Sequence, residues 1–356
     1  MPETIINVVG FLMLGWTNNF GYAIMLSAAE DLIGDRAPTA VVLLCDILPS
    51  FLIVLLYPLF QHKVKTWVTT LVAAAFSVLG FIFAGLSQKN YVLGLIGVIF
   101  TSLQQGLGES SLLAYSSLFQ SSCVAAWSFG TGLAGLTSTF LYMLLTTILK
   151  LDKSLIIWCF SPMPAIFLVS FWITKPAYQL VTDQDEQQSS LSFTARLSLL
   201  KPHLLVYVSM FAVFTFEYSI MSGVDAVLDY PSNPGMFYTY SCFASQIGVF
   251  LARASLSLIK LPYFFIPTLF IVQAVNLVLF SLEAKFYYVN SFWGMLVWVA
   301  FMGLCGGLTY GNGVYQLQVR GGDHSKFLLS AASCFINLGI LTASGIASLL
   351  QTALEK

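Results

Sequence analysis

The sequence predicts an all-α protein that crosses a membrane many times. Of its 356 residues, 58% are hydrophobic and 9% are charged, whereas roughly a quarter of the residues in ordinary soluble domains are charged. The apolar residues form long runs separated by short polar breaks. Because about 20 apolar residues in a helix span the roughly 30 Å hydrocarbon core of a bilayer, these runs indicate membrane-spanning helices surrounded by lipid.

The polar breaks divide the chain into eleven predicted spans. We expect the first span to be retained rather than cleaved, because it has an acidic Glu3, no basic region and an apolar run longer than that of a signal peptide. In chain order, the predicted spans cover about residues 5–28, 39–60, 66–87, 91–119, 122–148, 154–174, 203–228, 236–259, 262–282, 290–316 and 326–352.

The longest break, residues 175–202, predicts a cytosolic linker loop, because it combines acidic residues with a Gln/Ser-rich patch. It separates a predicted bundle of six spans, residues 1–174, from a predicted bundle of five, residues 203–356. Two helical bundles around a pathway near the bilayer midplane are typical of major-facilitator transporters. We expect a major-facilitator-like fold that lacks the usual twelfth span.

The distribution of basic residues favours a cytosolic N-terminus. Of the 15 basic residues, eight fall in the loops that this orientation places in the cytosol and six on the opposite side, which is a weak positive-inside bias.

The sequence lacks the motifs of common enzymes. It contains no His-Glu-x-x-His, P-loop or Cys-x-x-Cys pattern, and its three histidines lie at span edges. The six cysteines fall in or beside apolar runs, so we interpret them as small core residues. A net charge of −1 does not favour nucleic-acid binding. We expect no enzyme activity, no catalytic residue, no metal and no cofactor.

Two glutamates inside predicted spans are the first candidates for function, since ionisable groups are costly in a membrane and usually face the bundle interior. Glu109 shares one helical face with Ser102, Gln105 and Ser116, which predicts a polar stripe along a wet cavity. Glu217 lies deep in the seventh span. For both, a structural polar clamp is the alternative to a role in solute or proton binding.

Two more ionisable side chains leave both interpretations open. Asp46 precedes Pro49, and we expect Pro49 to break the second span. Asp46 has either a functional or a structural role. Arg253 either extends to the interface or binds an anion, because a guanidinium can grip a phosphate or carboxylate at two points. Asp225 is predicted to be a solvated carboxylate at a helix end.

Amide side chains at mid-depth in the first span, Asn18 and Asn19, together with Tyr22, could bind substrate hydroxyl groups. Adjacent asparagines do not share a helical face, so at most one should face a cavity. Gln273, Asn276 and Asn312 are more consistent with interhelical hydrogen bonds than with ligand contacts.

Several stretches within the spans resemble one known family, the battenin family. The similarity extends over nearly the whole chain. The matching stretches are LGWTNNFGYAIMLSAAED at 14–31, AVVLLCDILPS at 40–50, GLGE at 106–109, WSFGTGLAG at 127–135, the Glu217-Tyr218 pair and GVFLARAS at 248–255.

The resemblance implies a multi-pass lysosomal or vacuolar membrane protein that clears glycerophosphodiesters, with basic amino-acid transport and organelle pH control as less specific proposals. Asp46, Glu109, Glu217 and Arg253 match the family's pattern. Asn337 departs from it, because the family has an aspartate near this position.

These expectations combine into one hypothesis of alternating access. Arg253 attracts a small anionic solute such as a glycerophosphodiester, Asn18, Asn19 and Tyr22 contact its hydroxyls, and Glu109 or Glu217 responds to protons. Tyr178 and Val181 fit a tyrosine sorting signal for a sorting adaptor. The rival is a non-transporting membrane scaffold that affects lysosomal pH, trafficking or basic amino-acid homeostasis.

Overall fold

The computed structural model describes residues 2–28, 39–88, 90–174, 193–256 and 258–354. Every regular element in these ranges is a helix. Most of the predicted linker, including Tyr178 and Val181, lies outside the described residues. The chain groups into two compact units, one formed by residues 1–204 and 314–334 and the other by residues 205–313 and 335–356. The predicted boundaries of the two bundles remain a prediction.

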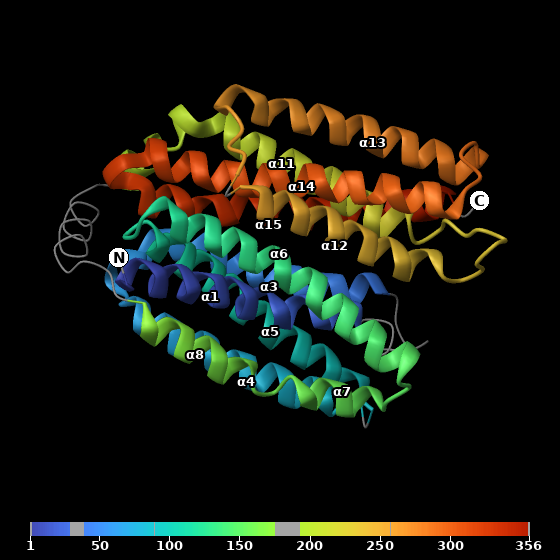
Figure 1. Cartoon of the computed structure of the whole chain (residues 1–356), viewed down its shortest axis with the longest axis horizontal. Helices are drawn as coiled ribbons and strands as arrows, with labels where there is room; N and C mark the ends of the chain where they lie inside the picture. Colours follow the sequence, from blue (N-terminus) through green and yellow to red (C-terminus); the bar gives the residue numbers. More distant parts are fainter. Residues whose placement is uncertain (1, 29–38, 89, 175–192, 257, 355–356) are drawn as a thin grey trace. The chain divides into compact units, whose positions relative to one another are not determined.

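Most of the first unit comes from the N-terminal half of the chain, and Figure 1 shows its long helices running side by side. Its elements are α1 (Pro2–Ser27), α3 (Thr39–Phe60), η2 (Gln61–Lys63), α4 (Thr66–Gly85), α5 (Tyr91–Ser116), α6 (Ser121–Met143), the π-helical turn η3 (Leu144–Ile148), α7 (Lys153–Cys159), α8 (Met163–Ile173), α10 (Phe193–Ser198) and η4 (Lys201–His203).

The second unit consists mainly of helices from the C-terminal half. They are α11 (Leu204–Ser219), its π-helical continuation η5 (Ile220–Val224), α12 (Phe237–Ser255), η6 (Tyr263–Phe265), α13 (Ile266–Phe286), α14 (Phe292–Gly321), η7 (Gly322–His324) and α15 (Ser325–Leu354). The last helical turns of α14 and the start of α15 group with the first unit.

Each predicted span corresponds to a helix or a broken helix in the described residues. In the part of the chain that the structure describes, seven helical ranges are long and apolar enough to cross a membrane, and one of them, Phe292–Leu354, joins α14 and α15. The total of eleven spans remains a prediction. The structure shows breaks that the pattern did not predict, since the sixth segment is divided into α7 and α8 around Pro162.

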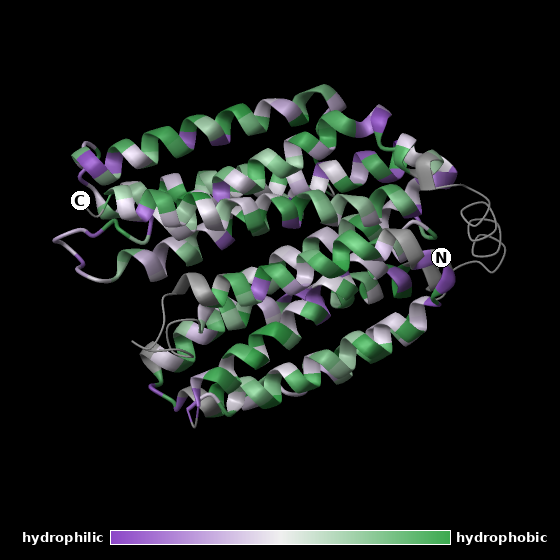
Figure 2. Ribbon diagram, turned by 180° about the vertical axis from the view of Figure 1, so that it is seen from behind, coloured by the Kyte–Doolittle hydropathy of each residue, from purple (hydrophilic) through white to green (hydrophobic). Residues whose placement is uncertain are grey.

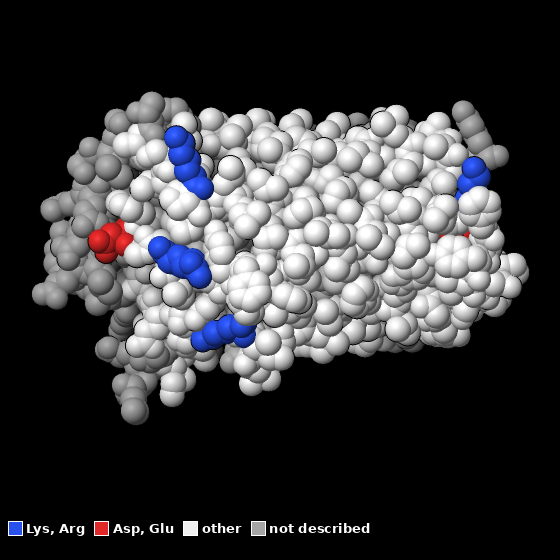
Figure 3. All heavy atoms as spheres, turned by 90° about the horizontal axis from the view of Figure 1, so that it is seen from above, with Lys and Arg blue, Asp and Glu red and all other residues white. Residues whose placement is uncertain are grey.

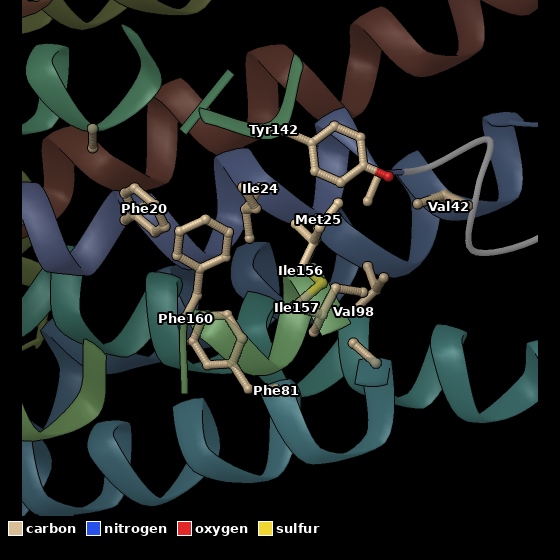
Figure 4. Close-up of a cluster of buried hydrophobic side chains, with 13 residues drawn as sticks. Phe20, Ile24, Met25, Val42, Phe81, Val98, Tyr142, Ile156, Ile157 and Phe160 are labelled. Atoms are coloured by element: carbon tan, nitrogen blue, oxygen red, sulfur yellow. The ribbon is translucent and has the colours of Figure 1, made fainter. Parts of the chain in front are cut away.

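An apolar cluster forms the core of the first unit. Phe20, Ile24 and Met25 of α1 meet Phe81 of α4 and Val98 of α5, as Figure 4 shows. Tyr142 and the residues Ile156, Ile157 and Phe160 complete the cluster. Burial of these side chains holds α1 against the rest of the unit, so these α1 residues face protein rather than lipid.

Glycines bring α1 and α6 into close contact. A Cβ built at Gly15 would lie 2.5 Å from the Trp127 carbonyl oxygen, and one at Gly130 would overlap the Leu12 carbonyl oxygen. Close backbone approach through small residues is the usual way for membrane helices to associate, because lipid offers no hydrophobic driving force between them.

The exterior fits a lipid environment. Figure 2 shows helices that are mostly green or white along their length, with the strongest purple in connections and at helix ends. On the face drawn in Figure 3, Lys, Arg, Asp and Glu appear towards the two ends, and the wide band between them carries none. Large apolar side chains such as Trp172, Leu258 and Val297 are exposed. The chain is therefore an all-α, multi-pass membrane protein.

Candidate functional site

The amides of α1 are held against α5. Gln104 donates a hydrogen bond to the Asn18 side-chain oxygen at 2.9 Å and another to its backbone oxygen at 3.3 Å. The Asn18 amide nitrogen donates to the Asn19 Oδ1 at 3.1 Å and to the Gln105 carbonyl at 3.4 Å. Asn18 is fully buried, whereas Asn19 and Tyr22 are half-buried. Thus Asn18 orders the α1–α5 contact, and Asn19 and Tyr22 are the more accessible of the three.

Gly108 makes the Asn18 contact possible. A Cβ at this position would overlap the Asn18 Oδ1. The sequence analysis missed both Gly108 and Gln104 as partners of Asn18. The sequence did contain one sign of the Gln104 contact. Gln104 is adjacent to Gln105, and consecutive residues on a helix face different neighbouring helices.

A serine from α5 takes part in the hydrogen bonding of α3. In a regular helix the Ser50 N–H would donate to the Asp46 carbonyl. Here the Ser50 N–H donates to the Ser102 Oγ at 3.0 Å, and the Ser102 hydroxyl donates to the Asp46 carbonyl. The prediction that Pro49 breaks the span is wrong, because α3 runs without interruption from Thr39 to Phe60. The helix lacks the backbone bond to the Cys45 carbonyl, because Pro49 provides no N–H.

The predicted polar stripe on α5 is partly occupied by this packing. Ser102 bonds to α3, and the Ser50 hydroxyl donates to the Gln105 Oε1 at 2.7 Å. A Cβ at Gly106 would lie 2.8 Å from the Ser50 Cα, which confirms that this small residue serves close packing. Ser116 donates back to the Leu113 carbonyl within its own helix.

Two buried carboxyl groups remain in the first unit. Asp46 is 1% exposed and Glu109 is 4% exposed. Neither carboxyl oxygen of Asp46 accepts a hydrogen bond from a described residue. The structure therefore brings Asn18 and Asn19 together, but it joins the Asp46 carboxyl to neither of them.

A charged cluster lies inside the second unit. Glu217 on α11 is 3% exposed, and Arg253 on α12 lies close enough to interact with it electrostatically. The Arg253 guanidinium carbon lies 4.1 Å from the centre of the Tyr310 ring on α14. Arg253 is 9% exposed.

The Glu217 carboxylate occupies space that only a glycine leaves open. A Cβ at Gly306 of α14 would overlap the Glu217 Oε2. α12 and α14 approach closely for the same reason, because Cβ atoms at Gly248 and Gly303 would overlap the carbonyl oxygens of Ala300 and Ser245. The cluster thus joins three helices, each positioned by backbone-to-backbone packing.

This arrangement is suited to binding a small anion. A guanidinium presents several N–H donors in one plane and pairs with phosphate or carboxylate at two points. Stacking on Tyr310 fixes one face of the Arg253 plane through a cation–π interaction. Glu217 on α11 is the acidic neighbour of Arg253.

A second acidic group of the second unit was not found by sequence reasoning. Glu283 on α13 is fully buried; the Tyr230 hydroxyl donates to it at 2.8 Å and the Val289 N–H at 2.9 Å. Burial, and then the bond to Glu283 and its charge, raise the pKa of Tyr230, so Tyr230 remains a neutral donor. Glu283 lay just beyond the predicted ninth span, so nothing marked it as buried.

Asp225 also differs from its prediction. It is 1% exposed rather than solvated, and the Ser241 side chain lies beside it. The loop from 225 to 236 folds back over the helix ends, which places Tyr230 in the apolar cluster with Phe237 and Phe292. A carboxylate at a helix end is buried when its own loop covers it.

The polar residues interpreted as structural form hydrogen bonds, and those of Gln273 and Asn276 with Met302 and Trp298 join α13 to α14. Gln273 donates to the Met302 carbonyl at 3.0 Å, Asn276 donates to the Gln273 Oε1 at 2.8 Å, and Trp298 donates to the Asn276 Oδ1 at 3.2 Å. Asn312 accepts from the Leu261 N–H at 2.7 Å. In the part of the chain that the structure describes, no group of three His, Cys, Asp or Glu is arranged to hold a metal.

Comparison with known proteins agrees with the predicted family. The family described as CLN3 protein matches residues 9–192 and 177–356. Protein BTN1 of Kluyveromyces lactis is 30% identical over 97% of this chain and 94% of its own length. Protein BTN1 of Saccharomyces cerevisiae is 30% identical over 97% and 93%, and Protein btn-1 of Neurospora crassa is 29% identical over 98% and 87%.

The fold matches solved transporters. The outward-facing crystal structure of FucP, a major facilitator superfamily transporter, aligns with a TM-score of 0.58 over 98% of this chain and 97% of FucP, at 15% identity. A structure of the same transporter described as the fucose:proton symporter of Escherichia coli aligns with a TM-score of 0.57. At such low identity the match shows the fold alone. The family match and the fold together show that the chain belongs to the CLN3 (battenin) family and has a major-facilitator-like fold.

Proposed function

We propose that this chain is a transporter of the lysosomal or vacuolar membrane that exports glycerophosphodiesters by alternating access. Membership of the battenin family and the transporter fold support a membrane transporter. The observation that supports an anionic solute is Arg253, a buried cation held over Tyr310 and beside Glu217. A permanently charged side chain is costly to bury, so its retention favours a role in binding.

In this proposal, the phosphodiester and Glu217 compete for Arg253. A glycerophosphodiester has one anionic phosphate, which the guanidinium can hold at two oxygens. While Glu217 is ionised, its charge satisfies Arg253; a proton on Glu217 would remove that charge and leave the guanidinium to the phosphate. Proton loading from an acidic lumen would thereby favour solute binding, and Glu109 is the corresponding candidate in the first unit.

The amide groups of α1 are proposed to recognise the rest of the solute. Asn19 and Tyr22 are half-buried and have the donors and acceptors that glycerol hydroxyls need. Asn18 is proposed to position Asn19 through their mutual hydrogen bond. Asp46 completes the set of candidate solute-binding residues. Export from the lysosome, the cytosolic N-terminus and a sorting adaptor at Tyr178 and Val181 belong to the same proposal.

The test is uptake of labelled glycerophosphocholine into vesicles that contain the variants. We expect Arg253→Gln to lower the initial rate by about tenfold or more, because a hydrogen bond to a charged group contributes roughly 1.5–3 kcal/mol. Arg253→Lys should retain only part of the rate, since an ammonium lacks the planar fork. Arg320→Gln is the matched control: Arg320 is exposed and bonds to Gln316 one turn earlier.

The outcome for Arg253→Gln decides the role of this cation. Uptake equal to wild type, with Arg320→Gln also unchanged, would remove Arg253 from solute binding. If purified wild-type protein produces no flux at all, the rival proposal of a non-transporting scaffold takes precedence.

A further inference from the structure

We propose that Asp46 is a proton-binding site, and that it releases its proton to water when α3 opens at Ser50. The proposal adds a proton site to the transport cycle proposed above, but only the last arm of its test depends on that cycle. It rests on the burial of the carboxyl group, on the lack of a hydrogen-bond donor to it among the described residues, and on the way Pro49 and Ser102 alter the hydrogen bonding of the helix that carries it.

The surroundings of Asp46 suit a neutral acid. The residue is 1% exposed, and among the described residues nothing donates a hydrogen bond to either carboxyl oxygen. An ionised carboxylate is a pure acceptor and needs several donors, whereas the protonated acid carries no charge. Burying the ion without partners costs far more free energy than burying the acid. The carboxyl group in this arrangement therefore holds its proton.

The described helices α1 and α5, which pack against α3, contribute no positive charge. α3 packs against α5, α1 and η2, and neither α1 nor α5 contains a Lys, Arg or His. The basic residues nearest in these elements are His62 and Lys63 of η2, and Lys63 lies 17 positions along from Asp46, which corresponds to about 25 Å of helix. The titratable groups of α3 and its partners are Glu3, Tyr22, Cys45, Tyr57, His62, Lys63, Tyr91, Glu109 and Tyr115.

None of these groups replaces a donor for the carboxyl group. Asp46 interacts electrostatically with Cys45, the preceding residue. The carboxyl group of Asp46 is itself affected by its burial. Glu109 would repel an ionised Asp46 rather than stabilise it.

The backbone at this point can open at low cost. Pro49 supplies no N–H to the Cys45 carbonyl, and the Ser102 hydroxyl of α5 binds both the Ser50 N–H and the Asp46 carbonyl. Helices bend where a side chain enters the hydrogen-bond ladder. Bending at Ser50 would admit water beside Asp46, the carboxylic acid would transfer its proton to a water molecule, and water would donate to the resulting carboxylate.

Infrared spectroscopy of the purified protein tests the proton directly. We expect the wild type at neutral pH to show the C=O stretching band of a buried carboxylic acid, and Asp46→Asn to lose one such band. Asp229→Asn is the control, because Asp229 is an exposed carboxylate that accepts from the Tyr230 and Gly235 N–H groups. Identical acid bands in wild type and Asp46→Asn would overturn the proposal.

Isotope labelling keeps the test independent of the folding of Asp46→Asn. The described buried aspartates are Asp46 and Asp225. In an Asp225→Asn protein labelled with ¹³C-aspartate, we expect a single isotope-shifted acid band from Asp46. The absence of any shifted acid band would contradict the proposal.

The last arm uses transport. In liposomes, we expect a pH gradient to change wild-type and Asp229→Asn flux by the same factor. Asp46→Asn should have a lower flux, since Asp46 is also a proposed solute-binding residue, and the gradient should not change the flux that remains. A normal gradient response in Asp46→Asn would show that its proton is not used in transport. Absence of flux in every protein would refute the proposed function but not the proton site, which the infrared bands decide.

Discussion

Polar side chains in the described spans differ most in the partners they have. Gln273 and Asn276 form hydrogen bonds with α14, and Asn312 accepts one from the Leu261 backbone, so each has partners for its buried amide. Glu283 is a buried acid whose two oxygens both accept bonds. Asp46 has no such partners, and Arg253 is positioned by a ring and a carboxylate. Gln273, Asn276, Asn312 and Glu283 therefore have a structural role. For Asp46 and Arg253 we propose instead the binding of a proton and of an anion.

For Glu283, we predict that Tyr230→Phe destabilises the second unit by about 1.5–3 kcal/mol, because the buried carboxylate loses its side-chain donor. The measurement is the apparent unfolding free energy from denaturation in detergent. Tyr288→Phe is the control, since Tyr288 is exposed and its hydroxyl donates to the Leu279 carbonyl at 3.1 Å. Equal losses in the two variants would contradict a structural role for the Tyr230–Glu283 bond.

For the Glu217 cluster, we predict that Gly306→Ala displaces the carboxylate and reduces solute uptake. The free energy of unfolding should fall by about 1–3 kcal/mol, as is typical when a side chain is added to a packed core. Gly345→Ala on α15 is the matched control, because nothing lies within 4 Å of its Cβ. That substitution should be neutral or stabilising by up to about 1 kcal/mol, through helix propensity. Unchanged uptake in Gly306→Ala would show that Glu217 needs no fixed position.

At the scale of helices, the sequence predicts which segments are helical better than it predicts the breaks and irregular turns within them. Apolar runs of span length are sufficient for the helices, because a lipid environment requires each segment to satisfy its own backbone hydrogen bonds. The division of the sixth span and the π-helical ends of α6 and α11 depend on packing between helices, which no local pattern encodes. Pro49 shows the same limit, since Ser102 from another helix decides how α3 accommodates it.

The candidate site follows the same division. Hydropathy identified Asp46, Glu109, Glu217 and Arg253 as groups within spans, and the structure shows that all four are buried. The partners Tyr310, Gly306 and Gln104 could not be predicted, because they lie on other helices or look like ordinary packing residues. Asp225 was placed in solvent because its covering loop is visible only in three dimensions.

Contacts between α1 and α6 give a prediction at the same scale. Gly130→Val should destabilise the first unit by about 1–3 kcal/mol, because the new side chain would force the two backbones apart at Leu12. Thermal unfolding in detergent measures the effect, with Gly345→Ala as the control. An unfolding temperature equal to wild type would show that α1 and α6 do not need this close approach.

For the whole molecule, the central claim is that the chain moves a small anion through the membrane by itself. Family membership and fold are consistent with this claim, and the buried Arg253 narrows the class of solute that we propose.

The most direct test is flux of labelled glycerophosphocholine into liposomes that contain only the purified protein. The account predicts saturable uptake that excess unlabelled glycerophosphodiester suppresses and that Arg253→Gln reduces by about tenfold or more. Uptake no greater than in protein-free liposomes, from protein shown to be folded, would contradict it.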